Sequence, residues 1–270
     1  MPLPAKRSRK ILEGYAHGPI TLHTQDDFDQ MYKVGRIAAE TLDHITAFVK
    51  AGTSTADLDQ EIESFIRRKG AIPATIGYNG YQHASCISVN HVAVHGIPRA
   101  DKILKSGDIL NIDVTPKLNG WHGDSSRMYM VGDKVPIKAR RLIEAVDKAL
   151  KQAIKQARPG NRLTQIGRAC EAVARDYGYS VSHEFCGHGI GLEFHDNPEV
   201  LHTEMDEAGC ILQPGMIFTI EPIFNVGKPA IKILSDGWTG VTRDRSLSAQ
   251  MEHTIGITED TPVIFTASPA

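Results

Sequence analysis

The sequence predicts an α+β domain made of two similar halves, in which antiparallel strands pack under four long helices. Stretches with apolar residues at helical spacing are followed by β-rich stretches punctuated by glycine, and this order occurs twice. The octapeptide GDILNIDV (Gly107–Val114) returns as GMIFTIEP (Gly215–Pro222), an offset of 215 − 107 = 108 residues. The hydrophobic fraction of 41% and the charged fraction of 23% are those of an ordinary folded domain.

Four amphipathic helices are expected, two in each half, at Asp26–Lys50, Thr55–Lys69, Pro136–Ala157 and Thr164–Tyr177. The stretch Gly52–Gly70 lies over Gly160–Gly178 at the same offset, since 160 − 52 = 108. Apolar periodicity is generic, so one matching helix would mean little. Two helices and a strand at one offset indicate a duplication. Gly52 and Gly160 are expected to cap the first helix of each pair.

Five strands are expected, at Cys86–His91, Ile109–Thr115, Arg127–Val131, Ile217–Phe224 and Met251–Thr258. No low-complexity segment or shift in composition marks an internal linker. We therefore expect residues 21–270 to form a single domain of two duplicated halves. A chain of this size buries enough surface to fold without a disulfide or a structural metal.

Residues 1–20 are expected to form a flexible basic arm, because four cationic side chains there accompany a single acid, Glu13. A contact with ribosomal RNA, or a transit peptide, is the alternative for this arm. The net charge of −2 argues against nucleic acid as the main partner. The four cysteines form no CxxC pair, which is typical of a reducing compartment, and no apolar run approaches the ~18 residues of a membrane span.

Two carboxylates stand at equivalent places in the repeated octapeptide, Asp113 and Glu221, each the seventh residue. An acid near the end of a buried strand is costly unless a cation meets it, so the two are expected to converge on a positive centre. Asp124 follows Asp113 across a turn, and Glu252 opens a later strand. The pairs Asp113/Asp124 and Glu221/Glu252 are interpreted as equivalent pairs of acids, one in each half of the sequence. For Asp124, an Asx-turn in the Gly-Asp sequence is the alternative.

Between the two acidic regions lies FCGHGIGLEFHDNP, which carries His188 among glycines and His195 seven residues later. Glycine neighbours let the imidazole of His188 point into a cleft, where a neutral nitrogen is a good metal ligand. The lysine and the spacing of a phosphate-binding loop are missing. Four carboxylates and one histidine suit two divalent ions, for which Mn, Fe, Co and Zn all remain open. His95 and His195 fall outside the pattern of paired strands and are expected to be second-sphere donors to the substrate.

At these residues the chain resembles the type I methionine aminopeptidases of metallopeptidase family M24. The resemblance runs from about Thr21 to Phe265 and rests on the motifs SVNHVAVHGIP, NIDV, HGDSS, GHGIG, TIEP, DGWT and SAQMEHT. It implies a pseudo-twofold pita-bread fold and a cytoplasmic enzyme of bacterial type. It also implies the activity: removal of the initiator methionine from nascent polypeptides with a small second residue. A metal-bridging hydroxide would attack the first peptide carbonyl.

The resemblance also implies a division of the ligands. Asp113 and Asp124 would hold one ion together with Glu252. His188 and Glu221 would hold the other, with Asp124 and Glu252 bridging the two. Glu221 would in addition be the general base.

The remaining site residues are likewise implied by the resemblance. His95 would lie near the scissile amide, and His195 would bind the substrate carbonyl. The methionine pocket would be lined by Tyr78, Tyr81, Cys86, Phe194 and Trp238. Thr75 stands where family members often have cysteine, which affects the fine shape of that pocket.

Further implied features lie outside the catalytic residues. A monovalent cation is expected near Asn90, Val92 and Ser248. The chain is expected to act as a monomer, away from membranes, with a transient contact to the ribosome.

Two alternatives remain at this point. A proline-specific aminopeptidase or prolidase has similar ligands but usually carries an additional amino-terminal domain. A metal-free binding protein of the same fold has lost ligands, whereas all five are present here. Assays with Met-Ala-Ser and with Ala-Pro peptides would separate the three.

Overall fold

The computed structural model describes residues 10–12, 18–204 and 209–269. Most of the expected basic arm therefore lies outside the described residues. Within it, β1 (Lys10–Leu12) pairs antiparallel with β2 (Ile20–Leu22). In the part of the chain that the structure describes, every helix is too short or too polar to cross a bilayer.

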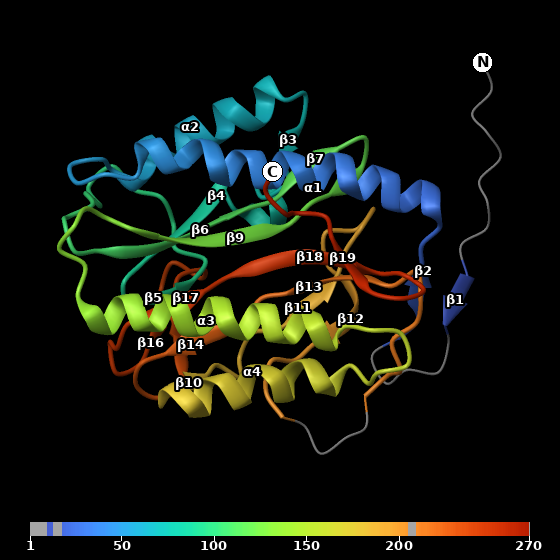
Figure 1. The fold of residues 1–270 in the computed structure, drawn as a ribbon. Coiled ribbons are helices and arrows are strands. Elements are labelled where there is room, and N and C mark those ends of the chain that lie inside the picture. The colour runs from blue at the N-terminus through green and yellow to red at the C-terminus, as the bar shows by residue number, and fades with distance from the viewer. Residues whose placement is uncertain (1–9, 13–17, 205–208, 270) are drawn as a thin grey trace.

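The four predicted helices are confirmed, as α1 (Gln25–Ile45), α2 (Thr55–Arg68), α3 (Ile137–Gln156) and α4 (Thr164–Tyr177). A 3₁₀ turn, η1 (Thr46–Phe48), extends α1. The apolar periodicity locates these helices because each buries one face, for example Leu42 and Leu58 in the first pair. Figure 1 shows α1 and α2 over one half of the sheet and α3 and α4 over the other.

The predicted glycine caps are wrong. The residues that cap α1 and α3 are Thr46 and Ala157. Gly52 and Gly160 lie farther on, in turns where their φ angles of 93° and 84° require glycine. Their amides donate to the carbonyls of Leu104 and Leu212, both at 2.9 Å.

These turns also reveal the duplication in three dimensions. The bridge between Ser54 and Ile103 recurs between Arg162 and Ile211, and 162 − 54 and 211 − 103 are both 108. The hydrogen bonds from Gly52 and Gly160 repeat at the same offset, because 212 − 104 is also 108. Equivalent turn contacts therefore recur at the offset that relates the two halves of the sequence.

One antiparallel sheet runs through both halves, in the order β12 (Asp196–Val200), β11 (Gly187–Gly189), β13 (Ile217–Ile220), β18 (Glu252–Ile257), β9 (Ser125–Met130), β6 (Ile109–Val114) and β4 (Ser85–Val89), with β19 (Pro262–Ile264) also on β18. The halves meet where β9 pairs with β18, through Ser126 opposite Glu252 and Ser125 opposite His253. The α+β class and the pita-bread fold are confirmed.

Three small sheets complete the fold: β10 (Ser180–Val181), β14 (Ile223–Asn225) and β17 (Ser248–Gln250); β15 (Ile231–Ile233), β16 (Gly240–Thr242) and β5 (Val92–Val94); and β3 (Ile72–Pro73), β7 (Pro116–Leu118) and β8 (Trp121–His122). A short 3₁₀ turn, η2 (Tyr78–Gly80), precedes β4.

The strand predicted at Ile217–Phe224 divides in two. β13 ends at Ile220 and belongs to the large sheet, whereas β14 begins at Ile223 in a small one. Pro222 explains the break, because proline has no amide to donate and is excluded from the middle of a sheet. Ile220 pairs with His253, so Glu221 and Glu252 come next to each other at the edge of this break.

Candidate metal centre and substrate cavity

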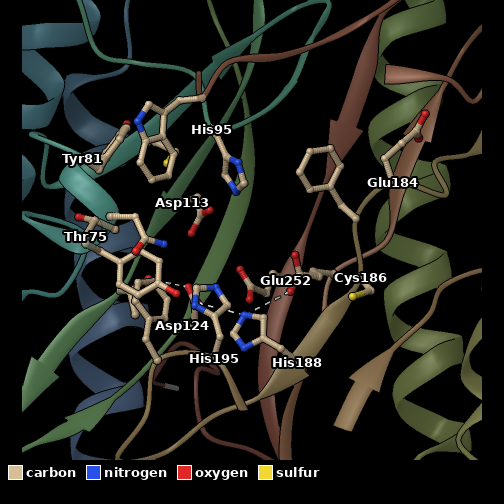
Figure 2. A pocket seen from close by; sticks show the side chains of 18 residues that line it. Thr75, Tyr81, His95, Asp113, Asp124, Glu184, Cys186, His188, His195 and Glu252 are labelled. Atoms are coloured by element: carbon tan, nitrogen blue, oxygen red, sulfur yellow. Dashed lines mark hydrogen bonds and ion pairs between the residues drawn. The ribbon is translucent and has the colours of Figure 1, made fainter. Parts of the chain in front are cut away.

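A cavity of about 400 Å³ opens at the junction of the two halves. It is lined by all five predicted metal ligands, by both predicted substrate histidines and by every predicted residue of the methionine pocket: Asp113, Asp124, His188, Glu221, Glu252, His95, His195, Tyr78, Tyr81, Cys86, Phe194 and Trp238. Figure 2 shows Asp113, Asp124, His188 and Glu252 pointing toward one another inside it.

The strand register explains why these carboxylates converge. Ser126 on β9 lies opposite Asp113 on β6 and opposite Glu252 on β18. Residues in one row across neighbouring strands project from the same face, so Asp113 and Glu252 face the same cavity. Asp124 precedes Ser126 by two residues and therefore shares that face. Ser126 is the backbone partner of Asp113 in the ladder, and the side chain of Asp124 nevertheless reaches the Asp113 carboxyl, so the expectation that the two acids come side by side is confirmed.

His188 lies on β11 and faces the carboxylates. Its Nδ1 donates to the carbonyl of Gly189 at 3.0 Å, which leaves Nε2 as the lone-pair nitrogen. Nε2 is 3.7 Å from Asp124 Oδ2 and 3.7 Å from Glu221 Oε1. Ligand atoms of Asp124, His188 and Glu252 all lie within 4.8 Å of one another. Burial lowers the pKa of His188 to about 3, so the ring is the neutral imidazole that a metal requires.

The electrostatics of this cluster call for a cation. Burial raises the pKa of Asp113 to about 7 and that of Glu221 to about 8. It also raises the pKa values of Asp124 and Glu252 well above their ordinary range, with further increases from the neighbouring carboxylates. Among the described residues that line the cavity, none is lysine or arginine. Divalent ions would supply the missing positive charge, and the donor set of carboxylate oxygens and one imidazole fits them.

Several side chains that sequence reasoning missed hold the carboxylates in place. Thr115 Oγ1 donates to Asp124 Oδ1 at 2.8 Å. Thr219 Oγ1 accepts from the amide of His188 at 3.0 Å and donates to Glu221 Oε1 at 2.7 Å, and so links two of the predicted ligands. The two threonines lie two residues from Asp113 and Glu221, so strand alternation was a usable signal for them.

Two more partners of Glu221 come from distant parts of the chain. Gln250 Nε2 donates to Glu221 Oε2 at 3.2 Å. The amide of Glu221 donates to Nε2 of His202, a histidine that is only 2% exposed, at 2.9 Å. Nothing in the local sequence around His202 indicates this contact, because tertiary folding creates it.

His195 and His95 lie beside the carboxylate cluster. The rings of His195 and His188 are 4.2 Å apart, and His95 is packed edge-on against Phe185 at 5.4 Å. Burial lowers the pKa of both His195 and His95, and nearby histidines lower that of His195 further, to about 4. Both rings are therefore neutral near pH 7 and available as hydrogen-bond donors or acceptors.

The residues expected to form the methionine pocket make the apolar part of the same cavity. Ring centroids of Tyr78 and Phe194 are 4.8 Å apart, and those of Tyr81 and Trp238 are 5.0 Å apart. Cys86 is buried opposite Asp113 in the β4–β6 ladder. An aromatic slot thus adjoins the cluster of carboxylates.

The residues predicted for a monovalent cation lie outside the cavity. Ser248 donates from its amide to the carbonyl of Asn90 at 2.9 Å, and its hydroxyl donates to Asn225 Oδ1 at 2.7 Å. Asn90 has a φ of 58°, and Val92 begins β5. The cation itself stays a prediction.

Comparisons with known proteins agree with this geometry. The pattern of metallopeptidase family M24 matches residues 29–259. A methionine aminopeptidase from Rickettsia prowazekii is 49% identical over 251 residues, which cover 93% of this chain and 96% of that protein. One from Escherichia coli K12 is 46% identical over 248 residues, which cover 92% and 94%.

Solved structures give the same result. The crystal structure of the Rickettsia prowazekii methionine aminopeptidase has a TM-score of 0.90 at 48% identity and covers 92% of this chain and 100% of that one. A prolidase from Pyrococcus furiosus has a TM-score of 0.75 at 24% identity, and the match covers 92% of this chain but 66% of the prolidase. At that identity the prolidase shares the fold alone.

Proposed function

The chain belongs to the methionine aminopeptidases of metallopeptidase family M24, and from this premise we propose how its cavity removes the first residue of a polypeptide. It is a metal-dependent hydrolase that acts on amino-terminal methionine. The observation that carries the proposal is that one cavity joins a five-ligand carboxylate–histidine cluster to an aromatic slot. The cluster would hydrolyse the peptide bond, and the slot would bind the side chain of the first residue.

Two divalent ions would be held by Asp113, Asp124, His188, Glu221 and Glu252, with Asp124 and Glu252 shared between them. When bound, such ions would supply positive charge to the scissile carbonyl and lower the pKa of water. The ligand set is compatible with Mn, Fe, Co or Zn. Thr115, Thr219 and Gln250 support the proposal, since outer partners of this kind orient carboxylate ligands.

The cavity side chains would then divide the work of hydrolysis. Glu221, held by Thr219 and Gln250, would accept a proton from the attacking water and pass it to the leaving amine. His195 would donate a hydrogen bond to the oxygen of the tetrahedral intermediate, and His95 would contact the scissile amide.

The aromatic slot would hold the methionine side chain. Tyr78, Tyr81, Phe194 and Trp238 present ring edges and faces, which make favourable contacts with a thioether, and Cys86 closes the wall. Nascent polypeptides with a small second residue are the proposed substrates. A cytoplasmic monomer with a transient ribosome contact, and a monovalent cation near Asn90, belong to the same proposal.

A chelation and reconstitution experiment tests the function. The purified protein, stripped with a chelator, should release no methionine from Met-Ala-Ser, and addition of Mn, Fe, Co or Zn should restore release. Cleavage of Ala-Pro peptides in its place would favour a proline-specific enzyme. Failure on both peptides with every metal would point to a binding protein.

A further inference from the structure

Asp59 is a buried acid on α2 that does not line the cavity. We propose that Asp59 is a positioning residue that fixes one wall of the methionine pocket and thereby sets the preference for methionine. This inference rests on the function proposed above. Its path runs from Asp59 through the backbone of residues 83–85 to two side chains in the pocket.

A single carboxylate holds three successive residues. Asp59 Oδ1 accepts from Ser85 Oγ at 2.6 Å. Asp59 Oδ2 accepts from the amide of Ala84 at 3.4 Å and lies 3.4 Å from His83 Nδ1. Asp59 is only 7% exposed, so these contacts take the place of water around its carboxylate.

Two of these three residues, His83 and Ser85, hold the pocket wall. Tyr81 donates from its hydroxyl to the carbonyl of Ser85 at 2.9 Å, and Thr75 donates from Oγ1 to the carbonyl of His83 at 2.7 Å. Both side chains line the cavity, and Figure 2 shows them on the side opposite Glu184 and Cys186. The two hydrogen bonds thus end on backbone that Asp59 fixes.

The consequence for substrate binding follows from the contacts of Tyr81. Its ring meets Trp238 edge-on at 5.0 Å, and these two rings form one side of the slot. A shift of the Ser85 carbonyl would move the Tyr81 ring relative to Trp238 and to Cys86 at the start of β4. Two acids of the carboxylate cluster, Asp124 and Glu221, are held by other side chains, namely Thr115, Thr219 and Gln250.

The choice of residue at this place supports the inference. Burial raises the pKa of the Asp59 carboxyl, which means that the folded protein bears a cost for keeping it there. An apolar side chain would fill the same space without that cost, but it would leave the amide of Ala84 and the hydroxyl of Ser85 without this acceptor. The carboxylate is therefore suited to holding the backbone rather than to filling space.

Three variants test the proposal. Asp59→Leu removes both acceptor oxygens, Asp59→Asn keeps one, and Ser85→Ala removes the shortest bond from the other side with less disturbance of the core. Asp57→Asn is the matched control, because Asp57 lies on the same helix but serves the amino-terminal capping box. Unfolding midpoints of all four should be measured, so that a general loss of stability is separated from a change in the pocket.

The readouts are kinetic parameters for Met-Ala-Ser and Leu-Ala-Ser, methionine affinity of the metal-free protein by calorimetry, and metal affinity. For Asp59→Leu and Ser85→Ala we expect KM for Met-Ala-Ser and Kd for methionine to rise roughly tenfold, as for loss of one buried hydrogen bond. Selectivity over Leu-Ala-Ser should shrink, while kcat and metal affinity change less than about twofold. Asp59→Asn should fall between wild type and Asp59→Leu.

Several outcomes would overturn the inference. One is that Asp59→Leu and Ser85→Ala bind methionine as tightly as the wild type, and another is that Asp57→Asn weakens methionine binding to the same extent as they do. A fall in metal affinity of the two variants that parallels their fall in methionine affinity would also overturn it, as would a wild-type protein that binds no methionine. Absence of turnover by the wild type would overturn the proposed function. Weakened methionine binding in the variants would support the role of Asp59 even then.

Discussion

Asp113 and Glu221 stand at equivalent places in the two halves, but the backbone around them differs. Asp113 lies within a continuous strand, paired with Cys86 on one side and Ser126 on the other. Glu221 lies where Pro222 ends β13. Its amide turns to His202, and its carboxylate is held by Thr219 and Gln250. The duplication thus supplies the location of both acids, and the broken strand gives one of them a side-chain environment of its own.

The helices differ between the halves in a similar way. α1 and α2 begin with capping boxes, formed by Thr24 with Asp27 and by Ser54 with Asp57. The N-cap residues of α3 and α4 are Pro136 and Leu163, and neither makes a side-chain capping hydrogen bond. Capping hydrogen bonds therefore stabilise the helices of the first half, whereas the helices of the second half depend more on packing against the sheet.

The largest effect is expected from the ligand in the unbroken strand. Asp113→Asn should weaken divalent-metal binding and lower turnover of Met-Ala-Ser by more than about 100-fold, since even outer partners of metal ligands are worth ~10–100-fold. Metal content by mass spectrometry and steady-state kinetics measure this. Full metal occupancy in the variant would contradict the assignment of Asp113 as a ligand.

A residue that serves chemistry without holding metal should behave differently. His195→Ala should lower kcat roughly 10²–10³-fold, because one donor to the developing oxyanion is lost, while metal content stays at the wild-type level. The metal content of His195→Ala is compared with that of Asp113→Asn by the same mass spectrometry. Loss of metal from His195→Ala would mean that His195 is itself a ligand.

The environment peculiar to Glu221 is tested at His202. His202→Leu leaves the Glu221 amide without its acceptor and should lower metal affinity and kcat by about tenfold each, within the ~10–100-fold range of outer partners. His202→Asn retains an acceptor oxygen and should recover part of both. Equal behaviour of the two variants would show that His202 acts only by filling space.

The smallest effects concern the helix caps. Thr24→Ala should lower the free energy of unfolding by about 1 kcal/mol through loss of the capping box. Pro136→Ser would add a cap to α3 in the second half and should raise it by a few tenths of a kcal/mol, because the cap gained is partly offset by lost proline rigidity. Urea denaturation at one pH measures both. A fall in the free energy of unfolding for Pro136→Ser, or an unchanged one for Thr24→Ala, would contradict this difference between the halves.

Sequence reasoning reached the helices and the carboxylate cluster because both depend on local regularities. Helical periodicity located α1 to α4, and the offset of 108 related Asp113 to Glu221 before any contact was known. The motif resemblance then indicated aromatic residues that line the same cavity. The prediction of one strand through Pro222 is wrong, because proline cannot donate a hydrogen bond within a sheet.

What could not be predicted depends on contacts between distant segments. His202 is 221 − 202 = 19 residues from Glu221, and Asp59 is 85 − 59 = 26 residues from Ser85, with no periodicity to relate either pair. The register that places Ser126 between Asp113 and Glu252 likewise arises only when the halves join. Gly52 and Gly160 need their positive φ angles for the turns after the helices, and a helix-capping pattern in the sequence does not distinguish the two uses of glycine.

The joining of β9 to β18 has a consequence for the timing of synthesis. A chain is made from its amino terminus at ~5–20 residues per second, so Glu252 follows Asp113, 252 − 113 = 139 residues earlier, by roughly 7–28 s. During that interval the emerging first half carries buried-strand carboxylates without their counterparts. The enzyme thus becomes competent only after Glu252 has joined the residues of the first half.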